Sequence, residues 1–141
     1  DDTALLEPCI HCFHVRGEQY RHLGIRRDRD RLRRRAADDV RAAAAPTLVE
    51  VTAALLVRNW AKGQAALDEL LEELDIDVVA MTAGAAEIAR SAYARYGKGV
   101  GSPAVLNFGD CLAYGVAMDM REPLLFKGND FSRTDLPAVP Y

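Results

Sequence analysis

The chain has few of the features that would place it in a specialised class of protein. Its three cysteines stand at uneven spacing, which argues against a disulfide framework and favours a reducing cytoplasm. No apolar run approaches the roughly 20 residues that a membrane span needs, and the first residues, Asp1 and Asp2, are not typical of a signal peptide. A net charge of −3 requires neither a nucleic-acid-binding nor a membrane-binding function.

The chain does have enough apolar sequence for a core. Half of its 141 residues are hydrophobic, which suits a single domain. From about residue 36, helical patterns alternate with short apolar strands, which predicts an α/β fold with a mainly parallel sheet. We expect helices over 46–57, 64–74, 83–96 and 106–120, strands over 76–81 and 123–127, an edge strand over 136–141, and a glycine-rich loop over 97–103.

Residues 1–35 follow no such pattern, so we predict an atypical N-terminal segment, disordered or out of frame, before a domain at 36–141. This segment holds no convincing buried strand and no apolar helical stripe. Its Cys-x-His-Cys-x-His run at 9–14 resembles half of a zinc site, but no second pair follows at a suitable spacing. The arginine run at 26–35 could contact phosphates, although it is more typical of a solvated helix or of out-of-frame translation.

Three acids stand where solubility would not place them. Glu50 lies inside an apolar helix, and Asp110 shares a helical face with apolar residues at 106, 113, 117 and 120. Asp130 follows the strand over 124–126 after a Gly-Asn turn. Because sites in open α/β sheets form at the carboxyl ends of strands, Asp110 and Asp130 are expected at the same end.

Carboxylates that converge in an apolar site need a cation to offset their repulsion. Mg²⁺ suits such a set, with Mn²⁺ as the alternative, because it takes one or two carboxylates and keeps several waters. Such a site can activate water and neutralise charge on a phosphodiester. Ordinary structural roles are the alternative. Asp110 would then be the N3 acid behind an Asn107 cap, while Glu50 would turn outward and Asp130 would sit in a turn.

Two motifs carry a family resemblance: LNFGDCLAYGVA at 106–117 and PLLFKGNDFSRTDL at 123–136. Together with YGKG at 96–99 and APTLVEV at 45–51, they resemble the C-terminal half of PIN-domain toxins of the VapC type, from bacterial toxin–antitoxin modules. The resemblance covers about residues 38–140. It implies a PIN-like three-layer α/β/α fold around four or five mainly parallel strands.

The resemblance also implies a function. Its members are Mg²⁺-dependent endoribonucleases that cleave structured RNA of the tRNA or rRNA class, form homodimers and are inhibited by a cognate VapB-type antitoxin. Glu50 matches the acid on the family's early helix, and Asp110 matches the metal-binding acid of the Gly-Asp motif. The fourth family acid often stands at the position of Gly128, so Asp130 is a neighbour that stands in for it.

The first acid of the family has no clear counterpart. It follows a buried strand in an Asp-Thr-Ser-Ala motif, whereas Asp2-Thr3-Ala4 follows no strand and is not assigned the role. Tyr20–Gly24 can be encoded TAT CGA CAC CTC GGC, and loss of one base gives codons for Ile-Asp-Thr-Ser. We therefore hypothesise that the segment before about residue 36 is translated out of the ancestral frame, which the nucleotide sequence of codons 15–36 would decide.

The leading hypothesis is thus a metal-dependent endoribonuclease with Glu50, Asp110 and Asp130 as metal ligands and catalytic acids. Arg95, Lys98 and Lys127 are the candidate contacts to RNA phosphates, since they flank the expected site. A degenerate PIN-like domain that only binds antitoxin or RNA is the second hypothesis, because one acid is missing. A plain α/β domain with scattered acids is the third.

Overall fold

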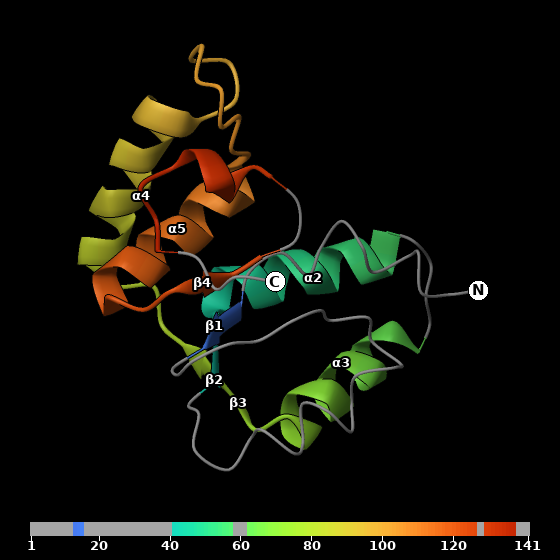
Figure 1. The fold of residues 1–141 in the computed structure, drawn as a ribbon. Helices are drawn as coiled ribbons and strands as arrows, with labels where there is room; N and C mark the ends of the chain where they lie inside the picture. Colours follow the sequence, from blue (N-terminus) through green and yellow to red (C-terminus); the bar gives the residue numbers. More distant parts are fainter. Residues whose placement is uncertain (1–12, 16–40, 58–61, 127–128, 138–141) are drawn as a thin grey trace.

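The computed structural model describes residues 13–15, 41–57, 62–126 and 129–137 (Figure 1). Within them the chain runs in the order β1 (Phe13–Val15), β2 (Arg41–Ala44), α2 (Ala45–Val57), α3 (Gly63–Glu73), β3 (Ile76–Val79), α4 (Ala83–Tyr96), α5 (Phe108–Met120), β4 (Leu124–Leu125) and the 3₁₀ turn η2 (Phe131–Arg133). No helix in the described part is long and apolar enough to cross a membrane.

The strands form one four-stranded sheet in the order β3-β2-β1-β4. β2 and β3 run parallel, with Ala42 opposite Asp77 and Ala44 opposite Val79. β1 runs antiparallel to both of its neighbours, β2 and β4. The expected α/β architecture is confirmed, but among the described strands only the β2–β3 pair has the parallel direction that was expected to dominate.

Helices cover the sheet from both sides. Figure 1 shows the strands between the α4–α5 pair and α3. On one side, Ala44 of β2 packs with Ala85 of α4 and Val116 of α5. On the other, Val51 and Leu55 of α2 pack with α3 in a separate apolar cluster. These contacts give the layered arrangement that the resemblance implies.

α4 and α5 approach each other closely because small residues line their contact. A Cβ placed on Gly115 would overlap the backbone oxygen of Ala85 and lie 2.8 Å from the Cβ of Ala89. Ala85, Ala89 and Gly115 are all buried. Any larger side chain at residue 115 would therefore push the two helices apart.

Both of these helices begin at residues that cap their free N–H groups. The Thr82 side chain accepts a hydrogen bond of 2.9 Å from the backbone of Ala85 at the start of α4. The Asn107 side chain does the same for Asp110 at the start of α5. Such caps satisfy N–H groups that the helix itself leaves unpaired. α2 has Pro46 in its first turn, where a missing N–H costs nothing.

The helix predictions are confirmed to within two residues at each end. The structure has 45–57, 63–73, 83–96 and 108–120 where the sequence predicted 46–57, 64–74, 83–96 and 106–120. The loop over 97–103 is confirmed as well. The predicted strands over 76–81 and 123–127 are present but shorter.

Three strand predictions need correction. The sequence analysis found no strand before residue 36, yet β1 lies there and is central in the sheet. It also missed β2, the other central strand. The edge strand predicted over 136–141 is absent at Leu136 and Pro137, although the Leu124 N–H donates to the Pro137 carbonyl over 3.0 Å. Residues 138–141 lie outside the described residues. Most of the N-terminal segment, including Cys9, His11, Cys12 and the arginine run, also lies outside it.

Candidate functional site

Asp110 lies at the start of α5 and is buried, with 4% of its surface exposed. Its Oδ2 accepts a hydrogen bond of 2.9 Å from the Asn107 backbone N–H, while its own N–H donates to the Asn107 Oδ1 over 2.8 Å. This reciprocal pair is a capping box, so the ordinary role expected for Asp110 is confirmed. The same bonds hold the carboxylate in one orientation at the N-terminal end of the helix.

Glu50 reaches the same place from α2. It is an exposed residue, yet a Cβ on Gly109 would overlap its carboxylate. Gly109 is therefore the position that lets the Glu50 carboxylate lie against the backbone of α5, next to Asp110 in the chain. The structure thus brings the Glu50 carboxylate from α2 to the turn of α5 that holds Asp110. Sequence reasoning missed the role of Gly109, because it considered only the acidic residue of the Gly-Asp motif.

Asp130 lies just before η2 and is exposed. The next residue, Phe131, packs in the same buried cluster as Leu106 and Cys111, which places η2 near the beginning of α5. Even so, the described residues contain no group of three or more His, Cys, Asp or Glu side chains that could hold a metal ion. The described structure therefore does not gather Asp130 with Glu50 and Asp110 into one ligand set, and its role as a ligand remains a prediction.

Cys111 follows Asp110 but has no sign of a reactive thiol. It is free and buried. Burial, with a further contribution from the negative charge of Asp110, raises the pKa of the Cys111 thiol to about 11. Because the thiolate is the nucleophilic form, this side chain behaves as a small apolar residue at neutral pH.

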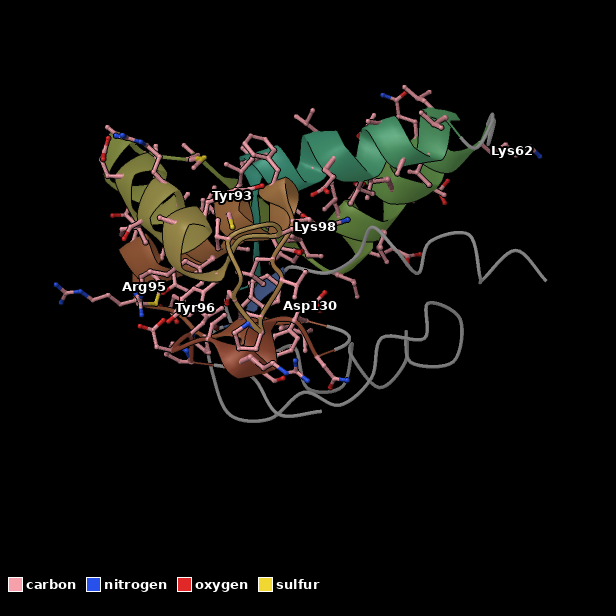
Figure 2. All side chains as sticks on the ribbon, turned by 90° about the horizontal axis from the view of Figure 1, so that it is seen from above. Lys62, Tyr93, Arg95, Tyr96, Lys98 and Asp130 are labelled. Carbon is pink, nitrogen blue, oxygen red and sulfur yellow. The ribbon has the colours of Figure 1, made fainter. Side chains whose placement is uncertain are left out.

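The candidate RNA-binding cations differ in their surroundings. Lys98 is exposed at the base of the loop after α4, and its backbone N–H donates to the Leu106 carbonyl over 2.7 Å. This bond ties Lys98 to the residue that precedes the Asn107 cap. Figure 2 shows Arg95 beside Tyr96 at the left of the view, away from Lys98 near its centre. Lys127 lies outside the described residues.

Arg95 belongs to a polar network that the sequence analysis did not foresee. Its Nη2 donates to the Asp135 Oδ2 over 2.9 Å, and its guanidinium lies 4.6 Å from the centre of the Tyr96 ring. The buried Tyr114 hydroxyl donates to the other oxygen of Asp135 over 2.6 Å. The network therefore ties the segment after η2 to both α4 and α5, and Arg95 is engaged within the protein. Asp135 is the next-to-last residue of the PLLFKGNDFSRTDL motif, and nothing in the sequence indicated that it binds a residue 21 positions earlier in the chain.

This network predicts a pH-dependent loss of stability. Hydrogen bonds from Tyr114 and then Arg95 hold the pKa of Asp135 at about 2, below its ordinary value of 3.8. A depressed folded-state pKa means that the contribution is present above pH 3.8 and is lost as the pH falls towards 2. Asp135→Asn should therefore lower the free energy of unfolding by about 1 kcal/mol at pH 6, a value reduced for the half-exposed carboxylate. Thermal melts between pH 2 and 6 should show the gap to the wild type closing towards pH 2; a gap that does not change with pH would contradict the prediction.

Comparisons with known proteins agree with this architecture. A model of the PIN domain matches residues 20–136 of the chain. VapC ribonuclease Mb0625 of Mycobacterium bovis and Ribonuclease VapC28 of Mycobacterium tuberculosis are each 59% identical over 69 residues, 49% of this chain and 52% of theirs. Ribonuclease VapC30 of M. tuberculosis is 41% identical over 103 residues, 73% of this chain and 78% of its own.

The chain spans about half the length of the first two of these curated relatives and more than two thirds of the third. The domain match covers most of the chain and includes Glu50, Asp110 and Asp130. The match begins at residue 20, the position where the hypothesis of out-of-frame translation places the Asp-Thr-Ser-Ala motif of the family. The chain therefore belongs to the PIN-domain family, among proteins of the VapC type.

Proposed function

We propose that the chain is a metal-dependent endoribonuclease, the toxin component of a type II toxin–antitoxin system. The observation that supports the proposal is the approach of the Glu50 carboxylate to Gly109, one residue before Asp110, where α2 and the start of α5 come together. The capping box accounts for Asp110 as a structural residue, but it does not involve Glu50. The relatives are named as ribonucleases, which agrees with an acidic site for phosphodiester chemistry.

A divalent ion fits the residues that are present. Mg²⁺ binds through one or two carboxylates and keeps several of its waters, so the pair Glu50 and Asp110 can hold it, with Mn²⁺ as the alternative. The bound ion would activate water and offset the charge that builds up on the phosphodiester. Asp130 is the proposed third acid, since η2 lies near the start of α5.

The protein's own residues supply orientation. The capping box fixes the Asp110 carboxylate, and the missing side chain at Gly109 leaves room for that of Glu50. Lys98 is the proposed contact to an RNA phosphate, because its loop is tied to the residue before the α5 cap. Arg95 and Lys127 are weaker candidates, the first because Asp135 already binds its guanidinium.

The proposed partners follow from the family. We propose RNA of the tRNA or rRNA class as substrate, a VapB-type antitoxin as inhibitor, a homodimer as the assembly and the cytoplasm as the location. A catalytically impaired domain that binds RNA or antitoxin without cleavage is the alternative. The sequence feature behind this alternative is the family's first acid, which has no clear counterpart in the chain.

The test is the metal dependence of RNA cleavage by the purified chain. Incubation with total RNA and Mg²⁺ should give fragments, and chelation with EDTA should abolish them, because two carboxylates without a cation repel rather than stabilise a phosphodiester. Addition of excess Mg²⁺ to the same EDTA-treated sample should restore cleavage. RNA binding with no cleavage at any Mg²⁺ or Mn²⁺ concentration would support the impaired alternative, and cleavage that persists in EDTA would contradict the metal site.

A further inference from the structure

Phe108 is an aromatic residue whose side chain is not packed in the hydrophobic core. It begins α5, and 71% of its surface is exposed. Phe126 and Phe131, by contrast, are buried and lie with ring centres 5.1 Å apart. A phenylalanine side chain left in water loses the favourable free energy of apolar burial, so stability does not account for this position.

The position of Phe108 points to the substrate. It stands between the Asn107 cap and Gly109, against which the Glu50 carboxylate lies. The capping box holds this turn of backbone from both sides, so the ring projects from a fixed point in the first turn of α5, one residue from the contact between Gly109 and the Glu50 carboxylate. Two further exposed apolar side chains, Val100 and Val105, stand on the loop that leads into α5. The edge of the acidic site therefore carries apolar surface.

The negative charge near the Phe108 ring favours a neutral ligand over an anionic one. Glu50 and Asp110 make the immediate surroundings acidic, which disfavours a phosphate directly over the ring unless a cation accompanies it. A nucleobase is neutral and has a flat face, and proteins bind unpaired RNA bases by stacking them on exposed aromatic side chains. A base held on Phe108 would leave the adjoining phosphodiester beside the carboxylates.

We infer that Phe108 is a base-stacking residue that holds one unpaired base of the RNA substrate beside Glu50 and Asp110. This inference rests on the proposed ribonuclease function and adds a substrate requirement to it. The RNA must present an unstacked base next to the cleaved bond, so a loop or single strand is bound and a continuous duplex is not. Stacking tolerates any base, and thus the ring positions the strand without selecting its sequence.

The test compares Phe108→Ala and Phe108→Trp with the wild type. Binding of a fluorescein-labelled, unstructured 12-nucleotide RNA is followed by anisotropy in EDTA, and its cleavage is followed with Mg²⁺. Loss of one stacked base should raise Kd about 5- to 100-fold for Phe108→Ala, whereas Phe108→Trp should bind like the wild type. Phe108→Ala should also raise KM more than it lowers kcat, whereas Phe108→Trp should leave both near the wild-type values. Val57→Ala, which trims another highly exposed apolar residue at the far end of α2, should change neither value.

The outcomes separate the inference from the function. If the wild type cleaves RNA and Phe108→Ala matches it in Kd and KM, the inference fails and the ribonuclease function stands. If the wild type neither binds nor cleaves RNA, both fail. If Phe108→Ala changes only the oligomeric state measured by size-exclusion chromatography, the ring is a protein contact, which also overturns the inference. Equal weakening for a fully paired duplex would contradict the requirement for an unstacked base.

Discussion

Asp110→Asn should reduce RNA cleavage by at least about 100-fold and leave the fold intact. A bound metal ion supplies several kcal/mol of stabilisation to the transition state, and about 2.7 kcal/mol corresponds to a factor of 100 in rate. Asn keeps an oxygen that can accept the hydrogen bond from the Asn107 N–H, so the capping box survives. It removes only the negative charge that would bind the ion. Cleavage rates in Mg²⁺ and thermal melts of both proteins measure the two effects.

Asp110→Ala is the matched comparison, since it removes both the charge and the Asp110 half of the capping box, while the Asn107 side chain still accepts from the N–H of residue 110. It should be as inactive as Asp110→Asn but less stable by about 1 kcal/mol, because the Asn107 N–H loses its acceptor. The pair therefore separates the two roles that the structure allows for this carboxylate. If Asp110→Asn cleaves like the wild type, or if activity falls only in proportion to stability, Asp110 is a capping residue and the proposed metal site is wrong.

The helices were predictable because their signals are local. Thr82 and Asn107 are cap residues, and both side chains accept hydrogen bonds from the first turn of the helix that follows. The inward face of α5 was also largely predictable: residues 110, 113 and 117 of the helix and residue 106 just before it are buried. Met120, predicted on the same face, is exposed, because it is the last residue of the helix. Periodicity and capping depend on neighbours within four residues, so a single sequence contains this information.

The central strands β1 and β2 were not predictable, because the interactions that stabilise them are not local. β2 is Arg-Ala-Ala-Ala, and alanine has the highest intrinsic preference for a helix. Pairing with β1 and β3 overrides that preference, and small side chains let Ala44 pack against α4 and α5. β1 spans only Phe13–Val15 within a segment with no strand pattern. These strands depend on partners far along the chain, which local propensity does not contain.

The candidate site also has some residues that the sequence indicated and others that only the structure could reveal. Glu50 and Asp110 were named from sequence, and the structure brings them together. What allows the meeting is the missing side chain of Gly109, which became visible only once α2 and α5 were placed. Asp135 and Tyr114 were missed entirely because their hydrogen bond joins α5 to a loop. Asp130, named with the first two, is not gathered with them in the described structure.

Judged by packing alone, Gly115→Leu should destabilise the protein more than any other single substitution that we propose in the described helices. Even a Cβ at this position would overlap the Ala85 backbone oxygen and lie 2.8 Å from the Ala89 Cβ. The backbone oxygen cannot move without shifting α4, and close-packed interiors do not absorb such an insertion. Overpacking of this kind costs about 3 kcal/mol, which lowers Tm by roughly 10 °C in a chain of this size.

Ala94→Leu is the control, because it adds the same bulk to α4 at an exposed position. Its free energy of unfolding should stay within about 0.5 kcal/mol of the wild type. Gly115→Ala should fall between the two, since the clash of one methyl group is partly offset by about 1 kcal/mol of helix propensity. Equal Tm values for Gly115→Leu and Ala94→Leu would mean that α4 and α5 do not approach through Gly115.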